Sequence, residues 1–66
     1  MWNLEGMTIT GKYMGEFPVR GRVKLSRVQY GGTVSHHVDL ETPIVVYGAT
    51  RDVVILNHAN IETVKD

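Results

Sequence analysis

The 66-residue chain contains no cysteine, which excludes disulfide bonds and zinc sites built on thiolates. A domain of this size buries only about 60% of its unfolded surface, and small folds commonly need an additional source of stability. Without disulfides, that source is close packing, association with another chain, or a metal held by oxygen and nitrogen ligands.

The chain also lacks an excess of either charge, because seven basic residues balance seven acidic ones. A general nucleic-acid-binding protein usually has a basic excess, so the composition argues against that class. No apolar run approaches the roughly 20 residues of a membrane-spanning helix. The first residues, MWNLEGM, have neither the basic nor the apolar part of a secretory signal. We therefore expect a cytoplasmic protein that does not contact a membrane.

Helical periodicity is absent from every ten-residue stretch, whereas Val, Thr, Ile and Tyr are abundant and seven glycines interrupt the chain. This pattern predicts an all-β protein. The expected elements are strands at residues 7–13, 17–30, 33–41, 44–48 and 53–56, with residues 49–52 joining the last two, then a 3₁₀ turn at 57–60 and a final strand at 61–64.

The strand at residues 17–30 changes its alternation partway along. Apolar residues hold the odd positions up to Leu25 and the even positions from Val28. Because side chains alternate with a period of two, this change needs one extra residue, and we predict a β-bulge near Ser26 that bends the strand. The Gly-Gly pair at residues 31–32 then predicts a two-residue hairpin turn.

The order of these elements resembles the SH3-like small barrels, in which a strand leads through one 3₁₀ turn into a short last strand, as VVILNHANIETV does here. The resemblance implies a single SH3-like barrel of five or six short antiparallel strands over residues 1–66. Residues 1–6 would form an N-terminal segment. Such barrels serve many unrelated functions. Residues 53–56 read VVIL and not the VQIY of the plasmid-type dihydrofolate reductases, so the resemblance assigns no functional residue.

The stretch SHHVDLE at residues 35–41 contains two histidines that must point to opposite faces of a strand. His36 shares the face of the apolar residues around it, so we expect it to be partly buried with one hydrogen-bond partner. His37 and Asp39 share the other face. With His58 they are a candidate metal site, and the pattern favours the simpler alternative of a solvated strand face.

Four basic residues, Arg20, Arg22, Lys24 and Arg27, lie close together without an acid among them. They form a candidate nucleic-acid-binding face. Counting outward from the Gly-Gly turn places Lys24 opposite Asp39 and Arg22 opposite Glu41, before the bulge shifts the register. The alternative is therefore cross-strand charge pairing.

The segments IVVY (residues 44–47) and VVIL (residues 53–56) do not alternate, which indicates strands buried on both faces. A single small barrel has one interior, so the second face needs another cover. Three covers are possible: the chain's own start, with Trp2 and Leu4; an identical chain; or a different protein. The predicted interface consists of Trp2, Val45, Tyr47, Val54 and Leu56.

The sequence shows no nucleophile in a catalytic setting and no phosphate- or dinucleotide-binding loop. We therefore expect no enzyme and no cofactor. The hypothesis is a binding or assembly module that forms a homo-oligomer or docks on a larger protein, with nucleic-acid binding by the basic face as the alternative. Its small size suits a phage or mobile-element accessory protein that acts on a host factor.

Overall fold

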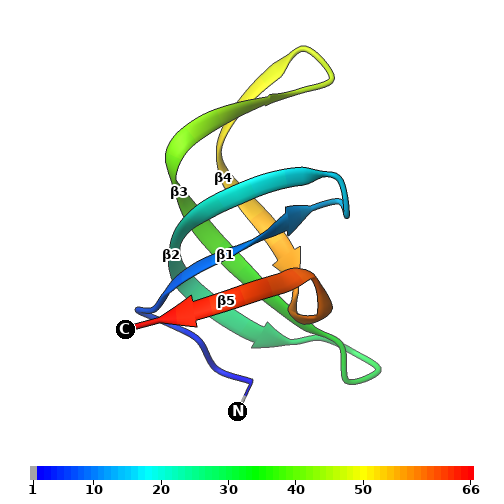
Figure 1. Cartoon of the computed structure of the whole chain (residues 1–66). Coiled ribbons are helices and arrows are strands. Elements are labelled where there is room, and N and C mark those ends of the chain that lie inside the picture. Colours follow the sequence, from blue (N-terminus) through cyan, green and yellow to red (C-terminus); the bar gives the residue numbers. More distant parts are fainter. Residues whose placement is uncertain (1) are drawn as a thin grey trace.

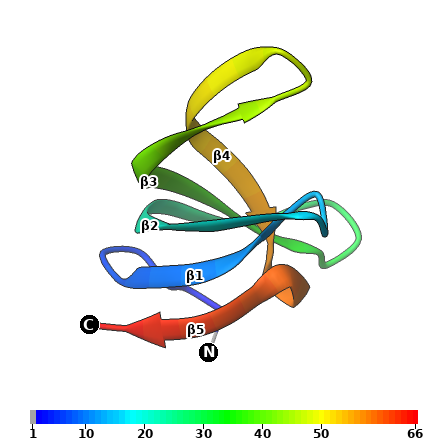
Figure 2. The same cartoon turned by 45° about the horizontal axis from the view of Figure 1, so that its top comes forward.

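The computed structural model describes residues 2–66, whose strands form one antiparallel sheet in the order β4-β3-β2-β1-β5 (Figure 1). The elements are β1 (Thr8–Tyr13), β2 (Phe17–Val28), β3 (Val34–Val46), β4 (Ala49–Asn57), the 3₁₀ turn η1 (His58–Asn60) and β5 (Ile61–Lys65). This confirms the predicted all-β chain with a 3₁₀ turn before the last strand. Of the five or six strands expected, five form, because the strands predicted at residues 33–41 and 44–48 join into β3. The sheet curls round its core but is not closed, because β4 and β5 remain its two edges (Figures 1 and 2).

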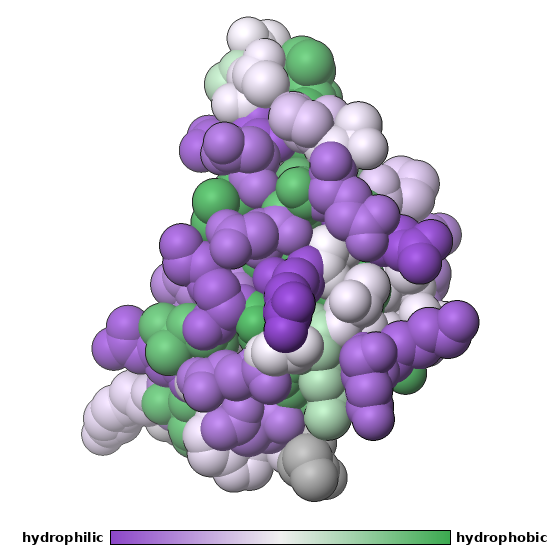
Figure 3. All heavy atoms as spheres, turned by 90° about the vertical axis from the view of Figure 1, so that its left-hand side faces the viewer, coloured by the Kyte–Doolittle hydropathy of each residue, from purple (hydrophilic) through white to green (hydrophobic). Residues whose placement is uncertain are grey.

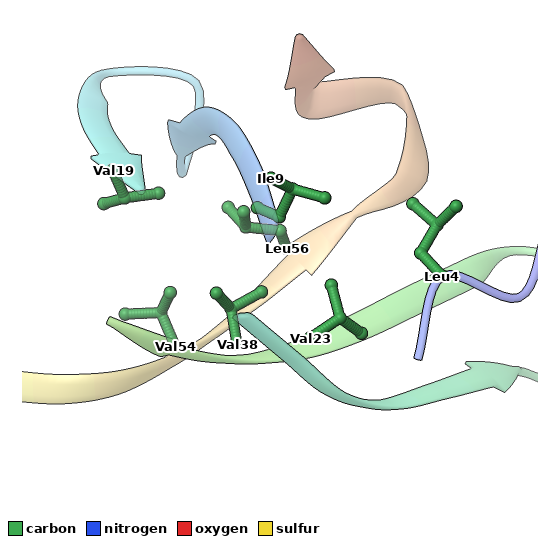
Figure 4. Close-up of a cluster of buried hydrophobic side chains, with 7 residues drawn as sticks. All are labelled: Leu4, Ile9, Val19, Val23, Val38, Val54 and Leu56. Carbon is green, nitrogen blue, oxygen red and sulfur yellow. The ribbon is translucent and has the colours of Figure 1, made fainter. Parts of the chain in front are cut away.

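The core is a cluster of aliphatic side chains on the inner face of the curled sheet (Figure 4). The first half of β2 follows the two-residue alternation of a strand with one buried face. Val19, Gly21 and Val23 are buried, and the residues between them are exposed. Every strand except β5 contributes to the cluster, and so does the segment before β1. The members are Leu4, Ile9, Val19, Val23, Val38, Val54 and Leu56.

The backbones of the long strands β2 and β3 lie close together at Gly21. A Cβ atom there would overlap the carbonyl oxygen of Asp39 and would lie 2.9 Å from the Cα of Leu40, so only glycine fits between these backbones. The predicted bulge exists, but it lies between Val23 and Leu25 and not near Ser26. As a result Leu25 points outward and Ser26 points into the core.

The β2–β3 turn also differs from the prediction. The N–H of Gly32 donates to the carbonyl of Gln29 over 2.9 Å, and the N–H of Gln29 donates to the carbonyl of Thr33 over 2.7 Å. Three residues, 30–32, therefore form the turn, and Val28 pairs with Val34. Relative to the predicted two-residue turn, the longer turn shifts the pairing of β2 with β3 by one residue. The bulge shifts it by one more residue.

The strand β3 does not end at Pro43. It continues to Val46 after a register shift between Asp39 and Ile44. The chain then reverses at Tyr47 and Gly48, whose φ angles of 50° and 81° are typical of a type I′ turn. The prediction that residues 49–52 connect the two strands is therefore wrong, because Ala49 already belongs to β4.

The N-terminal segment packs against β2. Leu4 enters the core at 5% exposure, its N–H donates to Oγ of Ser26 over 3.0 Å, and the N–H of Gly6 donates to the carbonyl of Val23 over 2.8 Å. Residues 2–6 lie at the opposite end of the molecule from the tip of the β3–β4 hairpin (Figures 1 and 2). Of the three covers that the sequence left open for this hairpin, the N-terminal segment is therefore not the one used. Within residues 2–66, no helix has the length and apolar character needed to cross a membrane.

Candidate functional site

The predicted interface residues do not form one surface. Val54 and Leu56 lie in the core at 3% and 1% exposure, so the prediction that they face a partner is wrong. Val45 and Tyr47 are exposed at the hairpin tip, where the Tyr47 ring meets Phe17 edge to face at 6.1 Å. Trp2 is half-exposed on the N-terminal segment.

The outward side of the sheet carries a different apolar group, which we call the outward patch: Leu25, His37, Val53 and Ile55. Leu25, His37 and Ile55 are direct neighbours across β2, β3 and β4, and Val53 is two residues before Ile55 on the same face. The three aliphatic side chains are 40–51% exposed, and His37 between them is partly buried. Sequence alternation missed Leu25, because the bulge turns it to the outside.

The basic row on β2 is paired with acids on β3. Lys24 lies 3.8 Å from Asp39, which confirms one predicted pair. Glu41, however, pairs with Arg20 at 3.5 Å and not with Arg22, because the turn and the bulge shift the register. The side of the molecule where β2 and β3 bend is mainly hydrophilic, with small apolar areas between the polar side chains (Figure 3).

The predicted metal site of His37, Asp39 and His58 is not formed. His37 points outward, whereas the His58 side chain bonds to the inward-facing His36, and Asp39 is paired with Lys24. Within residues 2–66, no group of three or more histidine or carboxylate side chains is placed to hold a metal ion.

A hydrogen-bond relay, buried at Ser26 and His36 and exposed at Glu5 and His58, joins the N-terminal segment, β2, β3 and η1. Nδ1 of His36 lies 2.7 Å from Oγ of Ser26, and Nε2 of His36 lies 2.8 Å from Nδ1 of His58. The same Ser26 oxygen accepts the N–H of Leu4, and the Ser26 N–H donates to the Glu5 carboxylate over 2.9 Å. His36 is therefore fully buried with two partners, whereas alternation predicted partial burial and one partner.

Burial lowers the pKa of His36 below its ordinary value, and the neighbouring imidazole of His58 lowers the pKa further. His36 is thus neutral in the folded chain, with one nitrogen donating and the other accepting. Because the Ser26 oxygen already accepts from Leu4, its hydroxyl proton is free to donate to Nδ1 of His36. The proton on Nε2 of His36 then donates to His58, and every group in the relay is satisfied.

The relay ends at a shallow hollow of about 400 Å³ beside His58. Its lining has no charged residue: Gly32, Thr33, Val34, Asn57, His58 and Ala59. Ser26, at the other end of the relay, is 6% exposed. The Ser26 hydroxyl is therefore shielded from solvent, whereas the His58 end of the relay is exposed.

Comparison of the chain with models of protein families, with curated proteins and with solved structures gives no match.

Proposed function

We propose that this protein is a non-catalytic assembly module that associates with a second copy of itself through the outward patch. The supporting observation is that Leu25, Val53 and Ile55 lie on the outward face around His37, and that each is 40–51% exposed within residues 2–66. The N-terminal segment, the one candidate cover within the chain, has its apolar side chain Leu4 in the core.

The size of the patch sets the expected strength of association. Full burial of an aliphatic side chain is worth about 1.5–3 kcal/mol, so a half-exposed one contributes roughly 1 kcal/mol. Three such side chains on each of two chains give about 6 kcal/mol, which corresponds to a Kd of tens of micromolar before association costs are subtracted. A standard interface covers about 800 Å² per partner, close to a fifth of the 4444 Å² surface of this chain. The polar rim must therefore take part.

The rim of the patch favours an identical partner. It carries both signs of charge, with Arg22 and Lys24 on β2 and Asp39 on β3, and the whole chain has no net charge. A rim of a single sign would repel a second copy, whereas a mixed rim allows the copies to place opposite charges against each other.

We further infer that the fold is an open relative of the SH3-like barrels. The support is the order of its elements, the close approach of β2 and β3 at Gly21, and the 3₁₀ turn between β4 and a short β5 that pairs with β1. Such folds are used for binding in many contexts, so this likeness agrees with a binding role without naming the ligand.

The test is sedimentation equilibrium across a concentration series from about 10 μM to 1 mM, a range that begins below the Kd calculated without association costs and extends well above it. Wild type is expected to shift from monomer to dimer, and Ile55→Lys to remain monomeric. Tyr30→Lys is the matched control, since it adds the same charge at a loop side chain that is 98% exposed and outside the patch. A wild-type chain that stays monomeric at 1 mM would overturn the proposal, as would an Ile55→Lys chain that dimerises normally.

The ion pairs argue against the alternative function. Two of the four residues in the basic row, Arg20 and Lys24, already face a carboxylate, which leaves Arg22 and Arg27 as the remaining phosphate contacts. We expect no mobility shift of random DNA or RNA at low salt, where phosphate contacts are strongest. Binding that weakens steeply with salt and is lost in Arg22→Ala would favour the nucleic-acid role.

A further inference from the structure

The bond between His36 and His58 joins the centre of the sheet to the segment that ends it. His36 is in β3 and is fully buried. His58 is the first residue of η1, the single turn between β4 and the edge strand β5. The 2.8 Å bond between their imidazoles is the one side-chain hydrogen bond that ties η1 to the rest of residues 2–66.

We propose that the His36–His58 bond is an acid-sensitive latch, which holds η1 and β5 against the sheet and opens when both imidazoles are protonated. This inference does not depend on the proposed self-association.

The latch accepts one proton without breaking. In the neutral pair, one imidazole donates an N–H and the other accepts it. When the pair holds one extra proton, burial keeps that proton off His36, so a charged His58 donates from Nδ1 to Nε2 of His36. Nδ1 of His36 then carries the proton and donates to Oγ of Ser26, and the Ser26 hydroxyl rotates its own proton away from His36. The bond survives with its direction reversed, and a charge-assisted bond is at least as strong as a neutral one.

A second proton cannot be accommodated. Both facing nitrogens would then carry hydrogens, with no acceptor between them at 2.8 Å, and two positive charges would lie side by side. Among the bonds of the relay within residues 2–66, the other titratable group is Glu5, whose carboxylate accepts the N–H of Ser26 and does not bond to either imidazole. The hollow beside His58 has no charged lining residue, so no carboxylate there compensates the second charge.

The direction of the pH effect follows from His36. The closed latch keeps the pKa of His36 below its ordinary value of 6.5, so below that pH the open state binds one more proton than the closed state. The equilibrium constant for opening then rises about tenfold for each pH unit, until the lowered pKa of His36 is reached. Above the ordinary pKa the latch contributes its full stability.

The opening should be local, because η1 and β5 lie at one edge of the sheet. β5 pairs with β1 alone, and its residues are mostly exposed. Its other contacts are the 2.6 Å hydrogen bond between the Thr10 and Thr63 hydroxyls and the packing of Ile61 against the core. The β2–β3 pairing at the centre of the sheet does not pass through η1. Elements with few buried contacts open at low free energy, independently of the core.

The experiment is amide hydrogen exchange followed by NMR at pH 7.5, 6.5 and 5.5, expressed as protection factors so that the intrinsic pH dependence of exchange cancels. In wild type, protection of the β5 amides is expected to fall about tenfold per pH unit below pH 6.5, while β2 and β3 amides keep theirs. In His58→Gln, whose amide bonds to His36 without adding a second charge, the fall should begin at the same pH but be smaller, because the pKa of His36 in the closed state lies nearer its ordinary value. His37→Gln, on the opposite face of β3, is the matched control and should follow wild type.

A β5 protection that is independent of pH between 7.5 and 5.5 would overturn the proposal, as would a His58→Gln chain that follows wild type. Nitrogen-15 NMR of the imidazoles gives a second measurement that needs no substitution. Protonation of His36 should coincide with the loss of β5 protection, and a chain in which both imidazoles become charged while β5 stays protected would also overturn it.

Discussion

Replacement of Gly21 by alanine tests the close approach of β2 and β3 directly. An added Cβ would overlap the Asp39 carbonyl oxygen and would lie 2.8 Å from the Asp39 carbonyl carbon and 2.9 Å from the Leu40 Cα. All three atoms belong to backbone, so no side chain can rotate away and the paired strands must separate at this point. Gly21 pairs with Leu40 and its neighbour Arg22 with Asp39, so the ladder hydrogen bonds around the site lengthen as well.

The expected cost combines two effects. Overpacking of a tight site costs typically about 1–3 kcal/mol, and weakening one or two backbone hydrogen bonds adds about 1 kcal/mol. We expect Gly21→Ala to lower the free energy of unfolding by about 2–4 kcal/mol. A chain of 66 residues has roughly 3–10 kcal/mol in total, so this one methyl group removes a large part of the stability.

Urea denaturation followed by far-ultraviolet circular dichroism measures this loss. With a slope of about 1 kcal/mol per molar for a small protein, the midpoint should fall by about 2 M or more.

Gly31 is the comparison site, because it has a φ of 93° and nothing within 4 Å of an added Cβ. Gly31→Ala should cost only about 1–2 kcal/mol, from its left-handed backbone, and Gly31→Asn should cost less, since asparagine tolerates that conformation. At Gly21 we expect the opposite order: replacement by asparagine should lower the free energy of unfolding more than replacement by alanine. A midpoint for Gly21→Ala within about 0.5 M of wild type would refute the reasoning.

Two further substitutions separate core packing from surface charge. Leu56→Ala removes a core side chain that is 1% exposed and should cost about 2–5 kcal/mol in the same urea assay; an unchanged midpoint would show that Leu56 is not packed as described. Lys24→Ala breaks an ion pair with Asp39 in which both side chains are more than half exposed, so it should cost less than about 1 kcal/mol. That small difference should disappear in about 1 M salt, and a larger or salt-independent loss would contradict the assignment of a solvated pair.

Alternation predicted the strands well wherever one of their faces is polar. In β1 and the first half of β2, apolar and polar residues take turns, and the inward set follows from polarity alone. The same rule also predicted that His36 faces inward. Histidine is not an apolar residue, but Val34 and Val38, its neighbours at two-residue spacing, are.

The prediction failed where a polar side chain occupies an inward position. Leu25 was assigned to the inside because it is apolar, and Ser26 was taken as the start of a bulge. In the structure Ser26 is inside, since its hydroxyl is satisfied by His36 and by the N–H of Leu4. A buried polar group that finds partners is as acceptable in a core as an apolar one. Its partners lie 10 and 22 residues away, so no local pattern identifies them.

The VVIL segment posed a different problem. Both alternating sets on this strand are apolar, so polarity alone does not decide which set faces the core. Which set faces the core depends on how β4 pairs with β3, where Val38 lies opposite Val54 and His36 lies opposite Leu56. Residues directly opposite each other share a face, so Val54 and Leu56 follow the inward side chains of β3. The register in turn depends on the three-residue turn and the bulge, and neither was predicted at its observed position.

The latch residue His36 and the outward patch lie on opposite faces of the same three strands, β2, β3 and β4. Ser26, His36 and Leu56 form one cross-strand row on the inner face, and each is adjacent in sequence to a member of the outward row of Leu25, His37 and Ile55. A change in strand geometry at one row therefore reaches the other through single peptide units.

If acid weakens self-association, either His36 behind the patch or His37 within it is the sensor. An acid effect that remains in His37→Gln and is reduced in His58→Gln locates the sensor on the inner face, where His58 bonds to His36. The reverse result locates it in the patch, where a charged imidazole between Leu25 and Ile55 would have to be desolvated against a second copy.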